Sequence, residues 1–221
     1  MGIGKAQAES AMPLYVRTSG SRGVCPKAAN KHAKCAKCAA RALVPLDDHA
    51  LVEHFKGESA KFEDVVGIYA IDEDGRTSIL VADFDGEGWK GEAAAYRQAG
   101  AAEGVGVAVE RSRSGNGGHA WLFFDEPIEA SLARDLGCSL ISEAMNTSSA
   151  LNFQAYDRLF PAQDTVVENG FGNLIALPLQ GRAMLKSNSV FVDETFRAYS
   201  DQWRYLSGIV KVSRAHASKI V

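Results

Sequence analysis

The pattern of hydrophobic and polar positions changes near residue 65. Residues 1–20 show no apolar period, and the stretch that follows, to residue 46, is polar and rich in lysine. Beyond Val65, short apolar runs are typical of strands, and apolar positions three or four residues apart are typical of helices. We expect strands at 65–71, 77–85, 105–110, 120–124, 173–179 and 189–192, and helices at 91–103, 127–145 and 196–209.

The order of these elements predicts an α+β fold. Asp72-Glu-Asp-Gly75 is a turn signal between the first two expected strands and predicts a β-hairpin. Strands and helices then alternate irregularly, unlike a doubly wound parallel sheet. The polar stretch 146–171 is expected to form turns. We divide the chain into a flexible N-terminus (1–20), a small metal-binding element (21–60) and a main domain (61–221).

Length and composition set the class of protein. The chain has 221 residues, of which 46% are hydrophobic, and this suits one domain with a core and a small appendage. No apolar run approaches the roughly 18 residues of a membrane span. The N-terminus lacks the apolar segment of a signal peptide. We therefore expect a cytoplasmic protein that does not enter the membrane.

Charge is distributed unevenly along the chain. Residues 10–46 hold seven Lys or Arg and no acidic residue, whereas the chain from Asp47 onward holds 16 basic and 26 acidic residues. A basic segment joined to an acidic body indicates a local anion-binding footprint for nucleic acid. The alternative is a solvated charged tail without a partner.

Three cysteines in the basic segment predict a zinc site. The pair Cys35-Ala-Lys-Cys38 can place two thiolates on one Zn²⁺, and Cys25 is the natural third ligand. The fourth ligand stays open between His32, close by, and His54, on a predicted helix. Such a site would be structural, because a short polar segment cannot build a core without metal. Cysteines packed as small hydrophobic residues are the alternative, which the many lysines disfavour.

The end of the strand 77–85 carries two carboxylates. Period-two alternation places Asp83 and Asp85 on one face and Phe84 on the other, with the two acids about 7 Å apart along the strand. Neighbouring carboxylates repel each other and attract a divalent cation, and oxygen ligands suit Mg²⁺ or Mn²⁺. Without further context, such a pair is more often a simple strand-end turn.

The stretch 111–124 combines a polar, glycine-rich loop with His119 at the start of an aromatic strand. Glycine permits close approach of the backbone to an anion, and successive N–H groups can form a nest for it. The loop therefore predicts a phosphate site. A buried histidine with an ordinary structural role is the alternative for His119 alone.

Together these motifs resemble the archaeo-eukaryotic primase superfamily, and most closely the primase domain of TOTE conflict systems and the related CRISPR-associated primase-polymerases. The resemblance implies an RRM-like antiparallel sheet with flanking helices and a small N-terminal zinc element. It covers roughly residues 20–210. The segments that carry it are Gly67–Ala70, Ala82–Asp85, Glu110–His119, Tyr156–Asp164, Gly170–Gln180 and Asp201–Trp203.

The resemblance also implies roles for individual residues. Asp83, Asp85 and Asp164 would hold two Mg²⁺ or Mn²⁺ ions, with Asp157 as the rival for the third place. His119 would act as a catalytic residue that contacts the phosphates of the incoming nucleotide. His54 matches the family's zinc histidine better than His32. Further nucleotide contacts are expected from Ser114 and the amides of Gly115, Asn116, Gly117 and Gly118, with charge neutralised by Arg111 or Arg113 and with Asn173 in a substrate or structural role.

These assignments predict a primase-polymerase that joins NTPs or dNTPs to a 3′-hydroxyl on a single-stranded DNA or RNA template. Helicase or CRISPR adaptation partners are suggested by kinship alone. A non-catalytic zinc-dependent nucleic-acid-binding module is the main alternative, and the presence of all three carboxylates disfavours it. A metal-dependent nuclease is a third possibility, which the Ser/His motif disfavours.

Overall fold

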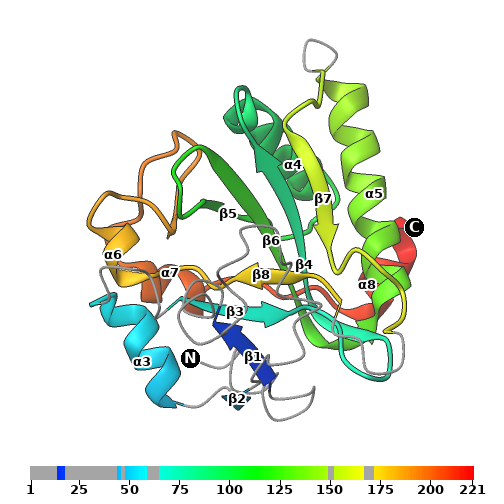
Figure 1. Cartoon of the computed structure of the whole chain (residues 1–221). Coiled ribbons are helices and arrows are strands. Elements are labelled where there is room, and N and C mark those ends of the chain that lie inside the picture. The colour runs from blue at the N-terminus through cyan, green and yellow to red at the C-terminus, as the bar shows by residue number, and fades with distance from the viewer. Residues whose placement is uncertain (1–13, 18–43, 46–47, 59–64, 149–151, 167–171) are drawn as a thin grey trace, which may run out of the picture.

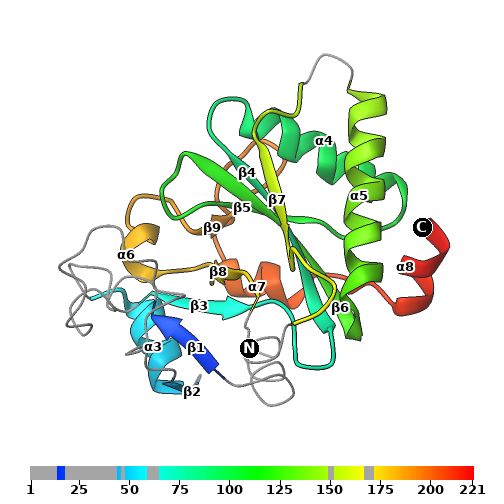
Figure 2. The ribbon, with the colours of Figure 1, turned by 45° about the vertical axis from the view of Figure 1, so that its right-hand side comes forward.

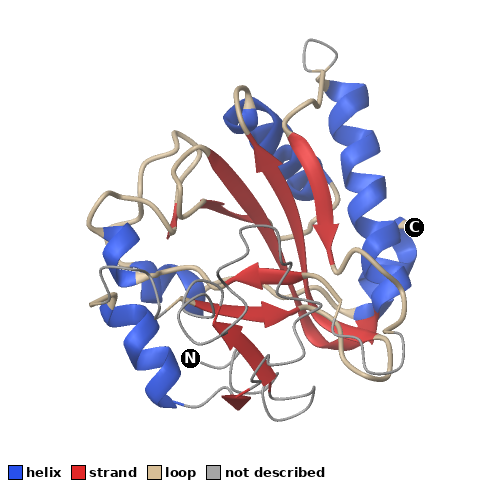
Figure 3. Cartoon of the chain, in the orientation of Figure 1, coloured by secondary structure: helices blue, strands red, loops and turns tan. Residues whose placement is uncertain are grey.

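The structure is a computed structural model that describes residues 14–17, 44–45, 48–58, 65–148, 152–166 and 172–221. It is an α+β protein with two antiparallel sheets (Figures 1 and 3). The strands of the smaller sheet run across the direction of those in the larger one (Figure 3). An antiparallel sheet with flanking helices confirms the predicted fold class.

The larger sheet has the strand order β7-β4-β6-β5-β9, and each pair of neighbouring strands is antiparallel. Helices α4, α5 and α8 lie together on one of its faces (Figure 2). The bounds are β4 (Arg76–Asp85), α4 (Trp89–Ala102), β5 (Ala108–Arg111), β6 (Gly117–Glu129), α5 (Ala130–Thr147), β7 (Tyr156–Phe160), β9 (Val190–Phe191) and α8 (Arg214–Ile220).

The smaller sheet and three helices cover part of the opposite face (Figure 1). This sheet has the order β2-β1-β3-β8. The bounds are β1 (Leu14–Arg17), β2 (Val44–Pro45), α3 (Asp48–Lys56), β3 (Val66–Tyr69), β8 (Leu174–Ala176), α6 (Gly181–Met184) and α7 (Gln202–Ser207). Residues 14–17 were expected to be flexible, but they pair with β3 and so belong to this sheet.

Alternation along β4 divides the core into two layers. Leu80, Ala82 and Phe84 are fully buried in the cluster that contains α4 and α5. Ile79 and Val81 point to the other face and pack in a second cluster, toward the smaller sheet. Asp83 and Asp85 continue this second row. The predicted acids therefore lie on the face away from α4 and α5.

The predicted hairpin between the first two strands is wrong. The turn itself exists, since the Asp72 amide donates to the Arg76 carbonyl over 2.9 Å. However, β3 pairs with β1 and β8, whereas β4 pairs with β6 and β7. The two strands diverge because each finds its partners in a different sheet, which a local turn signal cannot reveal.

Three other boundaries differ from the expectation. Pro127 lies within β6, and α5 begins only at Ala130. The helix expected over 196–209 is reduced to α7. Most important for the site, the polar stretch 146–171 contains a strand, β7, which pairs with β4. Among the described residues, none of the helices has the length and apolar content that crossing a membrane requires.

His54 does not have the predicted role of a zinc ligand. Its side chain is fully buried on α3. The Val66 amide donates to Nδ1 over 3.1 Å, so the proton lies on Nε2, which is 3.0 Å from the Pro178 carbonyl oxygen. Neither nitrogen retains a lone pair for a metal. His54 instead links α3 to β3 and to the segment after β8. Cys25, His32, Cys35 and Cys38 lie outside the described residues.

Replacing His54 by alanine is expected to lower the free energy of unfolding by about 2–4 kcal/mol, because two buried hydrogen bonds are lost and a cavity forms. Urea denaturation followed by circular dichroism measures the change. The control is His49→Ala on the same helix, where the side chain is 76% exposed and the expected effect is below about 0.5 kcal/mol. Equal stability of the two variants would contradict the structural role of His54.

Candidate active site

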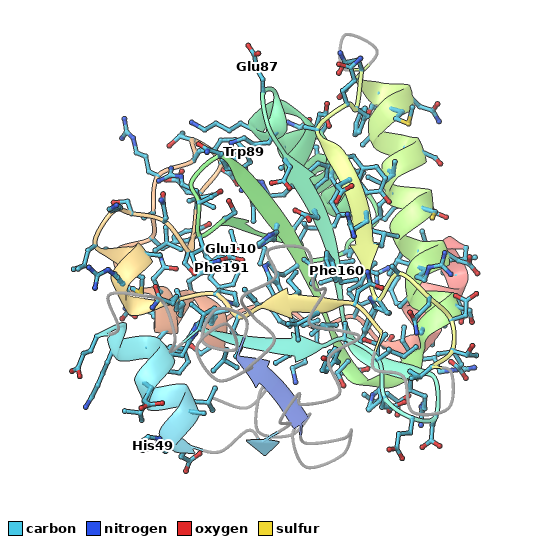
Figure 4. The ribbon with its side chains drawn as sticks, viewed as in Figure 1. His49, Glu87, Trp89, Glu110, Phe160 and Phe191 are labelled. Atoms are coloured by element: carbon cyan, nitrogen blue, oxygen red, sulfur yellow. The ribbon has the colours of Figure 1, made fainter. Side chains whose placement is uncertain are left out.

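One row of side chains crosses the larger sheet from edge to edge. Arg158 of β7 is opposite Asp83 of β4, which is opposite His119 of β6. His119 is in turn opposite Glu110 of β5, and Glu110 is opposite Phe191 of β9. Directly opposed residues share a face of a sheet. Figure 4 shows Glu110 and Phe191 close together at one end of this row.

Asp83 and Asp85 stand on this face as predicted, and Phe84 is buried on the other. Asp83 is nearly covered, with 14% of its side chain exposed, whereas Asp85 is exposed at the end of β4. The Asp85 main chain is held from both sides, by its pairing with Gly117 and by a hydrogen bond to the Ala155 carbonyl of 2.7 Å. The two carboxylates thus have a rigid support.

The third carboxylate beside them is Asp157. Carboxylate oxygens of Asp83, Asp85 and Asp157 lie within 4.8 Å of one another. A β-bulge explains why: Asp83 pairs with Arg158 and Phe84 pairs with Tyr156, so Asp157 is the extra residue on β7. A bulge re-aims the side chain of the extra residue. Asp157 and Arg158 are consecutive exposed residues, which regular alternation would not allow.

Asp164, the predicted third carboxylate, is not at this site. Its carboxylate forms an ion pair with Arg134 of α5. Its main-chain oxygen lies against Gly75, at the beginning of β4. From Gly75 to Asp83 the strand advances by roughly 25 Å. Because β7 runs antiparallel to β4, residues 161–164 lead away from the carboxylates toward the beginning of β4. Within the described residues, Asp157 and not Asp164 lies beside Asp83 and Asp85.

A buried carboxylate on α4 holds the start of β7. Glu92 is 2% exposed and accepts hydrogen bonds from the amides of Ala155 and Tyr156, at 3.2 and 2.9 Å. These amides come immediately before the bulge at Asp157. Glu92 therefore stabilises the backbone that presents Asp157. Sequence reasoning missed this residue, and its only signal was an acid on a predicted buried helix face.

His119 is oriented by a second buried carboxylate. Glu110, 1% exposed, lies 2.9 Å from Nδ1 of His119 and accepts from the Trp121 indole over 2.9 Å. A carboxylate only accepts, so the proton lies on Nδ1 and Nε2 faces the site. Nε2 is 3.6 Å from Asp83. The signal for Glu110 was an acid inside an apolar strand, but no role was assigned to it.

The charged groups of the row shift one another's pKa values. Burial raises the pKa of Asp83, and the nearby Asp85 and Asp157 carboxylates raise it further, although His119 opposes both effects. Burial works against the charged form of His119, but the carboxylates of Glu110, Asp83 and Asp85 together outweigh it, and the pKa of His119 is raised. The site concentrates negative charge around one imidazole, a setting that favours a bound cation.

The glycines of the loop 112–118 serve close packing more than anion binding. A Cβ on Gly117 would stand 2.5 Å from an oxygen of Asp85, and one on Gly118 would stand 2.3 Å from the Trp89 ring. The predicted nest of amides is only partly available, because two of them are used within the loop. The Gly115 amide donates to the Ser112 carbonyl over 3.0 Å, and the Asn116 amide to Ser114 Oγ over 3.2 Å.

The remaining predicted nucleotide contacts are spread over the loop and the smaller sheet. Arg111 donates to the carbonyls of Ser187 and Phe196, at 2.8 and 2.6 Å, which commits it to holding that segment beside the loop rather than to phosphate. Arg113 and Ser114 are exposed at the tip of the loop. Asn173 precedes β8 in the smaller sheet, and its role stays a prediction.

The donor set fits a hard divalent cation. Three carboxylates from two neighbouring strands offer only oxygen atoms, which Mg²⁺ and Mn²⁺ prefer. The spread of 4.8 Å between their oxygens matches the reach of a cluster that holds one or two ions about 4 Å apart. Burial is the main cause of the raised pKa of Asp83, and the charges of Asp85 and Asp157 raise it further.

Comparison with known protein families identifies the family of this chain. The family model for the archaeo-eukaryotic primase domain of TOTE conflict systems matches residues 5–220. The chain therefore belongs to this family. A search of curated proteins found no match.

Proposed function

We propose that the chain catalyses template-dependent nucleotidyl transfer for primer synthesis or extension. A 3′-hydroxyl would attack the α-phosphate of an NTP or dNTP, and pyrophosphate would leave. The convergence of Asp83, Asp85 and Asp157 beside His119, in a chain of the primase family, is the observation that supports this function most strongly. The TOTE family favours a conflict or defence setting.

The three carboxylates would hold Mg²⁺ or Mn²⁺, and two such ions when bound stabilise the attacking and leaving oxygens together. The protein's own groups have separate tasks. His119, fixed by Glu110, offers Nε2 to the nucleotide phosphates. Ser114 and Arg113 are exposed on the loop before β6 and are assigned to the same phosphates. The rigid sheet keeps these groups in place before substrate binds.

We also retain a structural zinc as a proposal, with Cys25, Cys35 and Cys38 as ligands. His32 becomes the candidate for the fourth position, because both nitrogens of His54 are occupied by main-chain groups. Helicase or CRISPR adaptation partners and a cytoplasmic location remain predictions of the same kind.

Synthesis on a single-stranded template tests the function. Purified protein is incubated with Mn²⁺ or Mg²⁺, labelled NTPs or dNTPs in parallel, and DNA or RNA templates with and without a primer. We expect products whose sequence is complementary to the template. Degradation of the template without synthesis would indicate a nuclease, and template binding without synthesis would indicate a non-catalytic binding module.

A further inference from the structure

Arg158 supplies positive charge to the carboxylate cluster in the structure. Its Nε donates to Oδ2 of Asp157 over 2.6 Å. Arg158 is the register partner of Asp83 across the β7–β4 pair. The bulge that brings Asp157 to the cluster thus brings Arg158 with it, because both residues oppose Asp83.

The guanidinium interacts with the cluster as a whole. The hydrogen bond to Asp157 raises the pKa of Arg158, and the charges of Asp157, Asp83 and Asp85 add to this. In return, the charge of Arg158 acts to lower the pKa of Asp83. Arg158 is half exposed, with 49% of its side chain accessible, so it can move away without breaking the core.

A divalent cation on these carboxylates would share the Asp157 carboxylate with the Arg158 guanidinium. One oxygen, Oδ2, already accepts the charged Nε–H. A cation held at about 2.1 Å by either oxygen of this carboxylate would place a second positive charge close to the guanidinium, and the two would repel each other. Guanidinium and metal therefore compete for the negative charge of Asp157.

We propose that Arg158 is a resident counter-ion of the carboxylate cluster, whose positive charge competes with a divalent cation for Asp157. This inference rests on the metal site of the proposed function. When no metal is bound, Arg158 partly neutralises the negative charge of the three carboxylates. The same positive charge weakens the affinity of the cluster for metal. The opposite role, a support that holds Asp157 ready for metal, would make Arg158 strengthen that affinity, so the two roles differ in sign.

Binding of Mn²⁺ alone, without nucleotide, shows whether Arg158 weakens or strengthens the metal affinity of the cluster. The free Mn²⁺ signal in electron paramagnetic resonance is titrated with wild type, Arg158→Gln and Arg158→Lys. We expect Arg158→Gln to bind Mn²⁺ about three- to tenfold more tightly, in line with the loss of one competing, partly screened charge. Arg158→Lys should lie between the two, because it keeps the charge but not the planar donor group.

Arg134→Gln is the matched control, since it also removes one positive charge and one ion pair, but at Asp164. Its Mn²⁺ affinity should equal that of wild type. Asp83→Asn should bind no Mn²⁺. Unchanged or weaker binding by Arg158→Gln, with a wild type that binds, would overturn the inference and leave the proposed function intact. Absence of binding in both wild type and Arg158→Gln would overturn the metal site and the inference together.

Discussion

Asp157→Asn is expected to abolish nucleotide transfer, whereas Asp164→Asn is expected to leave it within about twofold of wild type. The first change removes one of three converging carboxylates. Loss of a group that merely orients a metal ligand costs about 10–100-fold, so loss of a ligand should lower kcat/KM by about a thousandfold or more. Primer extension at saturating Mn²⁺, measured for both variants, gives the comparison.

Both substitutions replace an aspartate by an asparagine, and they differ only in where the aspartate lies in the fold. Asp157 lies on the bulge beside Asp83, and Asp164 lies with Arg134 near the beginning of β4. Both side chains are exposed by about half, so neither change should unfold the protein. Thermal melting of both variants verifies this. Retained activity in Asp157→Asn with loss in Asp164→Asn would show that the carboxylates regroup around Asp164.

His119→Ala is expected to lower kcat/KM for nucleotide by about a hundredfold, the lower range for a positioned group that acts on the reacting phosphates. Nε2 of His119 is the ring nitrogen directed at the site, next to Asp83. Steady-state kinetics with varied nucleotide concentration separates KM from kcat. Circular dichroism should show a folded protein, because the side chain is 16% exposed and lies at the edge of the core.

Glu110→Gln tests how far the function of His119 depends on the charge of the carboxylate that orients its ring. Glutamine has the same shape, and its oxygen can accept from both His119 and Trp121, so the ring orientation should persist with a smaller loss than in His119→Ala. His216→Ala is the control, since His216 belongs to α8 on the opposite face of the sheet and contacts the Glu103 carbonyl. Activity of His119→Ala equal to that of His216→Ala would exclude a role for His119 in nucleotide use.

Local sequence determined the parts of the site that lie on one strand. Alternation over 77–85 placed Asp83 and Asp85 on one face and Phe84 on the other, because the side-chain period of a strand is a property of the backbone itself. The position of His119 at the start of a strand followed from the glycine-rich loop before it. The α4 helix and the α+β class were equally accessible, since both depend on periodicity over short windows.

Only the tertiary structure decided how separate strands meet. Asp157 joins the cluster through a bulge in β7, and a bulge exists only in relation to the partner strand. The same irregularity breaks the alternation of β7, so the stretch was expected to form turns. Asp164 was preferred over Asp157 on the resemblance to the family alone. For a similar reason, the sequence did not predict that β3 and β4 belong to different sheets. A turn signal carries no information on which strands will pair.

Burial decided the roles of the other residues. The resemblance implied His54 as a zinc ligand, but Val66 and Pro178 occupy both of its nitrogens. Glu92 and Glu110 are separated in sequence from the groups they hold, and only packing reveals their function. The amino-acid sequence thus determined the chemistry and facing of each strand, because these are local. Register, bulges and hydrogen-bond partners come from non-local pairing, and they determined which of the predicted groups act together.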